Sequence, residues 1–286
     1  MQKFGFALFA LSFTLSACGP SKDHLNHYQK TRTYPVSGEC VESVAAVVIE
    51  RNGRFDVAAS MGSAFLRNKE RGIFATARHV IKLDVEYKLF FCGKVYKALR
   101  ILDPGVTDVG FLKITDKFDP DEFPEPYPIG GTVATGEKVF VQGVHMHPDN
   151  LQKGHVVHKI VEDYYQLSKY GREFVYDNLE AEIIDLSLRL QYSEEENRAE
   201  EREYLIRNNL TPLRTKEDHK ISFGGLSGGP TLNQRGEVVG INVTQHDEGY
   251  FVWDERGLNY RPRVTLEILP AEELKRAMAR LNITAR

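Results

Sequence analysis

The chain has 286 residues, of which 42% are hydrophobic and 27% are charged, the composition of an ordinary folded protein. Its formal net charge of -3 gives no electrostatic reason to expect nucleic acid or an anionic membrane as a partner. No segment after the N-terminus has the length and apolarity of a membrane span. The composition therefore predicts a globular body, and any indication of function must come from motifs.

The first 17 residues have the pattern of an export signal. Lys3 supplies a short positive region, and the apolar run from Phe4 to Leu15 is too short to span a bilayer. The segment ends in Leu15-Ser16-Ala17-Cys18, which resembles the bacterial lipobox, in which the cysteine becomes the lipidated first residue. A plain secretory signal with an incidental cysteine is the alternative. On the lipobox interpretation, residues 1–17 are removed and acyl chains on Cys18 anchor the protein to a membrane.

Residues 18–42 are polar and irregular and are interpreted as a tether between the lipid and a folded body over residues 43–286. Export makes an oxidising compartment the expected one, so Cys40 and Cys92 can form one disulfide. Two separate buried thiols are the alternative.

Short runs rich in Val, Ile and Phe, separated by turn residues, recur through the first half of the body. Repeated short strands at this spacing favour a β-barrel or sandwich over alternating β-α units. The runs are Val44–Ile49, Met61–Leu66, Ile73–Thr76, Tyr87–Phe91, Val109–Ile114 and Lys138–Val144.

A different composition follows, over approximately residues 155–220. Leucines and other apolar residues alternate with polar ones over Ile184–Tyr192, which predicts a half-buried strand. Residues 193–209 are rich in Glu and Arg and predict an exposed helix, with Ser193 and Glu196 as a capping box. A solvated surface helix is the simpler interpretation. A regulatory or partner-binding insertion near a functional site is the alternative.

The last part of the chain predicts more strands and one helix. Val238–Val243, Tyr250–Trp253 and Val264–Ile268 are strand-like, and Pro270 opens a helix. The apolar residues Leu274, Met278 and Leu281 lie on one face of that helix.

Two segments place a histidine and an aspartate where a catalytic pair is expected. In Phe74-Ala75-Thr76-Ala77-Arg78-His79-Val80, a strand delivers His79 at its end. In Thr107-Asp108-Val109-Gly110-Phe111-Leu112-Lys113, Asp108 precedes an apolar strand, where its carboxylate can accept a hydrogen bond from an imidazole N–H. Either segment alone is weak evidence, because His is common in cores and Asp is common in turns.

The third segment, Gly224-Gly225-Leu226-Ser227-Gly228-Gly229-Pro230, is the most specific. Glycines allow a tight loop that exposes a serine hydroxyl and directs backbone N–H groups at a developing oxyanion. A glycine-rich turn that happens to contain a serine is the alternative. The three segments, with Gly62-Ser63-Ala64-Phe65-Leu66 before them, resemble those of trypsin-like serine proteases, and their His, Asp, Ser order is the one found on the chymotrypsin-like fold.

The resemblance implies a mostly β fold of two six-stranded antiparallel barrels, with a helical insertion before the serine loop and a C-terminal helix. It implies a catalytic triad of His79, Asp108 and Ser227, with the amides of Gly225 and Ser227 as the oxyanion hole.

Three departures from the family pattern bear on activity. Gly110 replaces the usual Ala, and Leu226 stands where digestive members carry an Asp that pairs with a newly cut N-terminus. The resemblance therefore implies no such activation step. Ile221 stands where trypsin carries the acid that binds Lys or Arg, and with Ser222 nearby the expected preference is for a small or apolar side chain.

Four histidines fall in one short region and raise the question of a metal. The region lacks cysteine and a regular acid spacing, so loop histidines are the expected interpretation and no metal or cofactor is predicted. They are His145, His147, His155 and His158.

The sequence thus predicts a lipid-anchored serine endopeptidase of the bacterial cell envelope that acts on proteins or peptides. Gly19 after the lipidated cysteine, rather than Asp, favours the periplasmic face of the outer membrane. No nucleic-acid partner is expected, and residues 193–209 are the candidate surface for a regulatory partner. The alternative function is a trypsin-fold binding or sensing module that is inactive or is activated only by a partner.

Overall fold

The computed structural model describes residues 32–33, 43–51, 54–55, 61–146, 174–193, 195–215, 225–254 and 257–284. All of them belong to one compact unit, Thr31–Arg286. The predicted signal peptide, Cys18, Cys40 and nearly all of the tether lie outside the described residues. Within the described ranges, no helix has the length and apolarity needed to cross a membrane.

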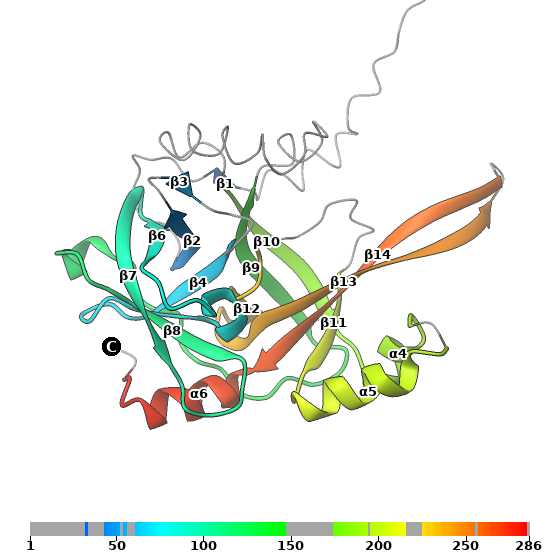
Figure 1. Cartoon of the computed structure of the whole chain (residues 1–286). Helices are drawn as coiled ribbons and strands as arrows, with labels where there is room; N and C mark the ends of the chain where they lie inside the picture. Colours follow the sequence, from blue (N-terminus) through cyan, green and yellow to red (C-terminus); the bar gives the residue numbers. More distant parts are fainter. Residues whose placement is uncertain are drawn as a thin grey trace, which may run out of the picture. The chain divides into compact units, whose positions relative to one another are not determined.

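The first barrel closes six antiparallel strands in the order β2-β4-β5-β8-β7-β6, with β6 pairing back to β2 (Figure 1). Its core is apolar, and the rings of Phe74, Phe91 and Phe123 pack edge to face within it. A short strand, β3 (Arg54–Phe55), pairs with β2 outside the ring. The six strands are β2 (Val44–Arg51), β4 (Met61–Asn68), β5 (Ile73–Ala77), β6 (Tyr87–Phe91), β7 (Lys94–Leu102) and β8 (Val109–Ile114).

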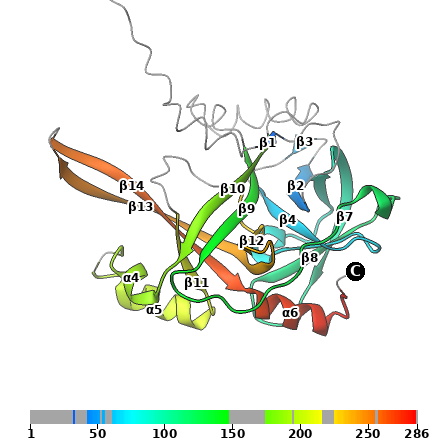
Figure 2. The same ribbon diagram turned by 180° about the vertical axis from the view of Figure 1, so that it is seen from behind.

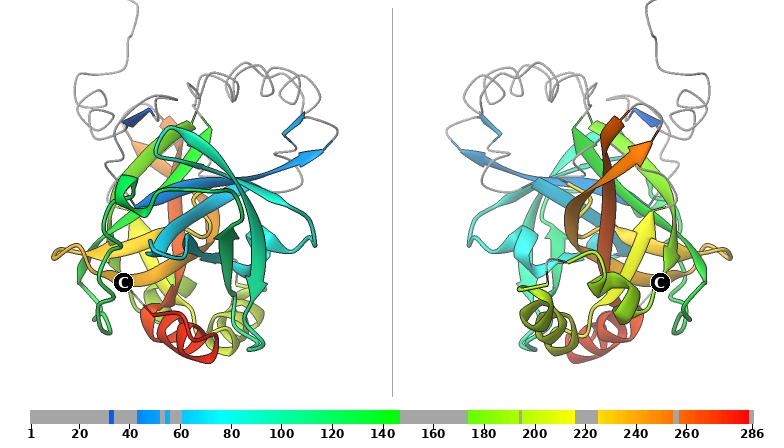
Figure 3. Two further views of the ribbon diagram at one scale, coloured as in Figure 1. Left: turned by 90° about the vertical axis from the view of Figure 1, so that its left-hand side faces the viewer. Right: turned by 90° about the vertical axis from the view of Figure 1, so that its right-hand side faces the viewer.

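The second barrel also closes six antiparallel strands, in the order β9-β10-β11-β14-β13-β12, with β12 pairing back to β9. β1 (Arg32–Thr33) adds to β10 outside the ring. Figure 3 shows the two barrels from two sides. The strands are β9 (Lys138–Met146), β10 (Phe174–Ile183), β11 (Thr211–Thr215), β12 (Pro230–Asn233), β13 (Val238–Asp254) and β14 (Gly257–Pro270). The predicted pair of six-stranded antiparallel barrels is confirmed.

β13 and β14 continue past the barrel as a two-stranded ribbon, paired as far as Asp254 and Gly257 (Figure 2). The predicted strands Val238–Val243 and Tyr250–Trp253 are therefore parts of one strand of 17 residues, with a register shift between Asn242 and Thr244.

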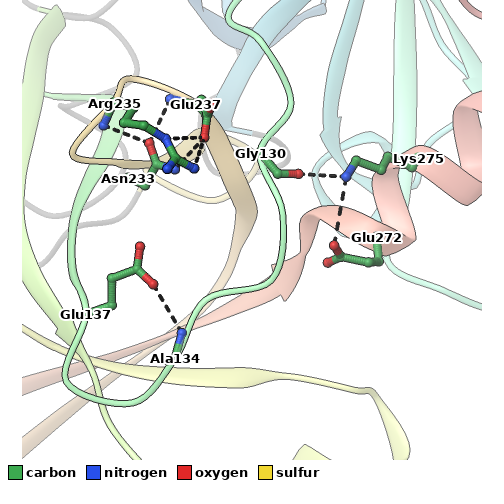
Figure 4. Close-up of polar contacts among 8 residues, drawn as sticks. All are labelled: Gly130, Ala134, Glu137, Asn233, Arg235, Glu237, Glu272 and Lys275. Atoms are coloured by element: carbon green, nitrogen blue, oxygen red, sulfur yellow. Dashed lines mark hydrogen bonds and ion pairs between the residues drawn. The ribbon is translucent and has the colours of Figure 1, made fainter.

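The C-terminal helix α6 (Ala271–Arg280) begins after Pro270, as predicted. It buries Leu274 and Met278, and Leu281 packs beside them. On its other side, the Lys275 ammonium donates to the Gly130 carbonyl at 2.7 Å, in the segment that connects the barrels (Figure 4). Near this connector, Asn233, Arg235 and Glu237 tie the β12–β13 turn together (Figure 4). The short 3₁₀ helix η2 (Pro120–Glu122) lies earlier in the same connector.

Between β10 and β11 the chain forms two helices, which confirms the predicted helical insertion but corrects its first half. The expected strand over Ile184–Tyr192 is wrong, because Leu186–Leu190 is a helix, α4. Asp185 caps this helix by accepting a hydrogen bond from the Leu188 amide at 2.7 Å. The helical turn allows Arg189 to point inward, where its side chain is fully buried.

The second helix of the insertion, α5 (Arg198–Arg207), confirms the helix predicted in the charged segment. The predicted capping box is wrong, because the helix begins after Asn197 and no side chain caps it. Ser193 instead accepts a hydrogen bond from Arg189 at 3.2 Å. In the insertion, a side chain therefore caps α4 but not α5, and the buried Arg189 contacts the residue that was expected to cap the second helix.

Candidate active site

His79 lies in a one-turn 3₁₀ helix, η1 (Arg78–Ile81), directly after β5. The buried side chains of Val80 and Ile81 anchor this turn in the first barrel, so the half-buried imidazole stays at the surface of the core. A strand that ends in a single anchored turn fixes both the place and the direction of the side chain.

One carboxylate holds both the backbone and the ring of His79. Asp108, the residue before β8, accepts from the His79 amide through Oδ1 at 2.8 Å and contacts the imidazole Nδ1 through Oδ2 at 2.6 Å. The Asp108 carbonyl also accepts from the Arg78 amide at 3.0 Å. Because a carboxylate accepts hydrogen bonds, the imidazole proton belongs on Nδ1, which leaves Nε2 as the nitrogen that can take a proton.

The loop that carries Ser227 is held by strand β13. The backbone carbonyl of Asn242 accepts from the Gly228 N–H at 2.7 Å, and the backbone N–H of Asn242 donates to the Gly229 carbonyl at 2.9 Å. Its side-chain nitrogen donates to the Leu226 carbonyl at 3.3 Å. Gly228 has a φ of +86°, a backbone conformation that is strained for residues with a Cβ atom. Glycine is thus required in the loop for its backbone conformation.

Close packing brings this loop against the strand ends on either side of His79. The Ser63 amide, in β4, donates to the Ser227 carbonyl at 2.7 Å. A Cβ placed on Gly62 would lie 2.9 Å from that carbonyl oxygen and 2.6 Å from Val80, the residue after His79. The structure therefore places the three predicted triad residues at one junction between the barrels.

The Ser227 hydroxyl makes no hydrogen bond to the imidazole in this structure. It donates to the Val243 carbonyl in β13 at 3.2 Å, and Nε2 of His79 makes no hydrogen bond to any described residue. The amides of Gly225 and Ser227 likewise donate to no described residue. Two N–H groups on a loop that are free to donate are what an oxyanion hole requires.

A family model for the trypsin-like peptidase domain matches residues 62–241. The chain belongs to this family. No curated protein has a significant match to the sequence. The matched range contains His79, Asp108 and Ser227, so the peptidase domain spans the junction described above.

Three of the solved structures that match the chain are proteases of low sequence identity. A serine endoprotease from Yersinia pestis has 18% identity and a TM-score of 0.48, and the match covers 85% of this chain and 64% of that one. The Rv3671c protease from M. tuberculosis, active form, has 18% identity and a TM-score of 0.47, covering 85% and 82%. The MamO protease domain from Magnetospirillum magneticum has 15% identity and a TM-score of 0.47, covering 83% and 96%.

Leu226, the departure from the family pattern, is buried in the core of the second barrel. A Cβ on Gly143 of β9 would lie 2.7 Å from its Cδ2 atom, which shows how closely the leucine is packed. Apolar burial therefore anchors the loop at the position where digestive relatives use a charge.

Two positioning residues, Ser63 and Asn242, were not singled out from the sequence. The buried Ser63 hydroxyl donates to the Gly225 carbonyl at 2.7 Å and accepts from the Val144 amide at 2.7 Å. Asn242 also donates to the Gln142 carbonyl at 2.8 Å, and its side-chain oxygen accepts from Thr231 at 2.6 Å. Both are polar residues inside short apolar runs, Met61–Leu66 and Val238–Val243, which is the sequence signal that could have marked them.

Several predicted residues lie outside the described part of the chain. They include Ile221 and Ser222 of the predicted specificity pocket, and His147, His155 and His158. His145 lies in β9, paired with Val175 of β10. Among the described residues, no group of three or more His, Cys, Asp or Glu side chains is placed to hold a metal ion.

Proposed function

We propose that the chain is a serine endopeptidase in which Ser227 is the nucleophile, His79 the general base and Asp108 the residue that orients the base. The observation that carries the proposal is that one carboxylate, Asp108, accepts hydrogen bonds from both the backbone N–H and the ring of His79, at 2.8 and 2.6 Å, beside the Ser227 loop. This contact holds the imidazole in the tautomer needed for base catalysis.

In the proposed reaction, the bond from Ser227 Oγ to the substrate carbonyl carbon forms as the Oγ proton moves to His79 Nε2. Nε2 then gives that proton to the leaving amine as the C–N bond breaks, and an acyl-enzyme remains. Water repeats the two steps and releases the acid. The amides of Gly225 and Ser227 stabilise the oxyanion in both halves of the reaction. The reaction requires no cofactor.

The serine must change its hydrogen bond before it can react. Its hydroxyl donates to the Val243 carbonyl, so attack requires a rotation about the Ser227 side-chain bond toward Nε2. Catalytic hydrogen bonds are often long or misaligned without substrate and tighten when it binds. Substrate binding along β13 is the event expected to drive that rotation.

The place of action and the specificity are proposed from the sequence. A lipidated Cys18 would anchor the enzyme in the cell envelope, at the periplasmic face of the outer membrane, with envelope proteins or peptides as substrates. Ile221 and Ser222 would favour a small or apolar side chain next to the cut. We also propose that Cys92 pairs with Cys40 in a disulfide, since export would place both in an oxidising compartment.

The Val243 hydrogen bond also favours a second candidate, a domain that is switched on only by a partner. A serine that is held away from its base in the free protein is consistent with control by the helical insertion, which a partner at residues 193–209 would relieve. If no partner ever activates the domain, it is a permanently inactive binding module of the same fold.

Labelling with a fluorophosphonate probe tests these functions directly. The purified mature protein is compared with Ser227→Ala and His79→Ala, with circular dichroism as the check on folding. Stoichiometric labelling of the wild type that is lost in both variants is the expected result. If folded wild type is not labelled even when its substrates are supplied as an envelope extract, the endopeptidase proposal fails and the binding module takes its place.

A further inference from the structure

An ion pair that is buried on one side lies just before the loop that delivers Asp108. Asp103, directly after β7, is fully buried, whereas the side chain of Arg280 is 38% exposed. The Arg280 guanidinium donates to both oxygens of Asp103, through Nε at 2.7 Å and through Nη2. The hydrogen bonds from Arg280 hold the pKa of the Asp103 carboxyl below its usual range. A bidentate arginine contact fixes the direction of a carboxylate as well as its position.

Only four residues separate Asp103 from Asp108, and they are held from both sides. Arg78, the neighbour of His79, donates through Nη1 to the Gly105 carbonyl at 2.9 Å. A Cβ on Gly105 would lie 2.7 Å from Nη2 of Arg280, so the loop backbone lies directly on the guanidinium. By contrast, Val106 at the loop tip is completely exposed. The loop has no apolar core of its own, so its shape depends on these polar contacts.

Arg280 is the last residue of α6, a helix that is itself fixed to both barrels. α6 packs against β13 and β14 of the second barrel and β8 of the first (Figures 1 and 2). Its Lys275 holds the connector between the barrels at Gly130. The segment after it is tied to β4 through the hydrogen bond from Asn68 to the Thr284 carbonyl at 2.7 Å. The guanidinium is thus presented from a rigid support.

We propose that Arg280 and Asp103 are positioning residues for catalysis: the C-terminal helix fixes the Asp103–Asp108 loop, and through it the contact between Asp108 and His79. The inference rests on the proposed function for its kinetic consequence, while the contact itself exists whether or not the protein turns over substrate. Neither residue touches the reacting atoms. They act by keeping the Asp108 carboxylate within hydrogen-bond distance of Nδ1, where a small displacement weakens the orientation of the base.

The test compares Arg280→Gln with Arg280→Lys and with the matched control Arg276→Gln in the full chain. Arg276 lies on the same helix, but its guanidinium is mostly exposed and pairs with Glu273 within the helix. We expect Arg280→Gln to lower kcat roughly 10- to 100-fold with KM within twofold of the wild type. Arg280→Lys should recover part of the loss, because an ammonium keeps the charge without the bidentate geometry. Arg276→Gln should leave both constants unchanged.

A spectroscopic measurement separates this proposal from the proposed function. The imidazole Nδ1–H of His79, hydrogen-bonded to a carboxylate, should give a downfield proton resonance that is assigned by its loss in Asp108→Asn. In Arg280→Gln this resonance should broaden or disappear, and in Arg276→Gln it should persist. A wild type that shows the resonance without turnover counts against the endopeptidase but still allows the positioning role to be tested.

Asp103→Asn provides the second variant in case Arg280→Gln does not fold, because it keeps the shape of the side chain and removes only its charge. It should weaken the same resonance and lower kcat in the same direction. A folded Arg280→Gln or Asp103→Asn protein with an unchanged Nδ1–H resonance and unchanged kcat would overturn the proposal. A loss of kcat that Arg276→Gln reproduces equally would also overturn it, because the effect would then belong to the helix as a whole.

Discussion

The two barrels contribute to the candidate site in different ways. The first barrel supplies His79 and Asp108 from adjacent strand ends, already joined by two hydrogen bonds. The second barrel supplies Ser227 on a loop whose hydroxyl donates to its own strand, at Val243. The His79–Asp108 pair of the candidate site is therefore joined in this structure, while no hydrogen bond joins Ser227 to that pair.

The surroundings of each half explain this difference. In the first barrel, β8 follows Asp108 directly and is buried at five of its six positions, and Asp103, before the loop that leads to Asp108, is paired with Arg280. The second barrel carries the helical insertion between β10 and β11 and the long β13–β14 ribbon. Regulation or substrate recognition is thus expected to act on the serine rather than on the His–Asp pair.

The largest effect is expected in the first barrel, from Asp108→Asn. An amide keeps the size of the side chain but can present an N–H to Nδ1, which favours the wrong imidazole tautomer, so kcat/KM should fall about 10⁴-fold. Asp116 is the matched control, since it follows the same strand, and its carboxylate accepts from the Lys97 amide at an exposed site. Steady-state kinetics on a peptide substrate measure both variants. A loss below tenfold in Asp108→Asn would show that the pair is not catalytic.

The second prediction concerns the insertion, where Arg189→Met should cost roughly 3–5 kcal/mol of unfolding free energy. Arg189 is fully buried and pairs with Glu267, also fully buried, and with Glu201. Its removal takes the Arg189 cation away from the buried Glu267 carboxylate. The exposed pair of Arg207 and Glu203 provides the control, and Arg207→Met should cost at most about 0.5 kcal/mol.

Urea unfolding measures both variants, and the double variant Arg189→Met/Glu267→Leu should recover much of the loss because neither charge then remains buried. Equal stability of Arg189→Met and wild type would contradict the view that this cluster holds the insertion on the barrel.

The third prediction tests how the serine loop is held. Asn242→Ala removes the side-chain contacts to Leu226, Gln142 and Thr231, so the rate of fluorophosphonate labelling should fall on the order of 10²-fold. Asn233→Ala is the matched control, because Asn233 is a buried asparagine of the same hairpin whose bonds lie in the β12–β13 turn. The Asn233→Ala variant should be less stable than wild type, but its folded form should be labelled at the wild-type rate. Equal labelling rates in Asn242→Ala and Asn233→Ala would show that Asn242 does not position the Ser227 loop.

The sequence predicted those strands whose apolar residues both mark them in the sequence and bury them in a barrel core. β6 and β8 match their predicted ranges because each is a short apolar run bounded by turn residues. β11 was not predicted, since Thr211-Pro212-Leu213-Arg214-Thr215 contains a proline and only one large apolar residue. Its place in the barrel depends on pairing with β10 and β14, which no local pattern reports.

The errors in the insertion have a similar origin. Leu186 and Leu190 are four residues apart, a spacing that a helix and an alternating strand both allow. The hydrogen bond from the Leu188 amide to Asp185 and the burial of Arg189 decide for the helix. At the site, the triad residues were predictable from short motifs. The Arg280–Asp103 contact was not, because it joins residues 177 apart in the chain.

The smallest effect is expected at Arg67, which lies in strand β4 of the first barrel. Its side chain is fully buried, with Cζ 5.9 Å from the centre of the Phe65 ring. Among the described residues only Nη1 has a hydrogen-bond partner, the Tyr127 carbonyl at 2.6 Å, while Nε and Nη2 have none. Burial lowers the pKa of Arg67 to about 10. Folding thus destabilises the charged form, and replacement by an apolar side chain of similar length, Arg67→Met, should raise the unfolding free energy by about 1 kcal/mol at pH 7.

The stability difference between Arg67→Met and wild type should depend on pH if it comes from the buried charge, whereas a difference that comes from packing should not. The unfolded chain holds the Arg67 proton more strongly than the folded one, so the cost of the charge is fully present below a pH of about 10 and falls as the pH rises through that value. The advantage of Arg67→Met should therefore shrink between pH 7 and pH values above about 10. Urea unfolding of both proteins in parallel cancels the titration of their shared groups. A variant less stable than wild type at pH 7, by the same amount at both pH values, would mean that the Tyr127 contact and packing outweigh the buried charge.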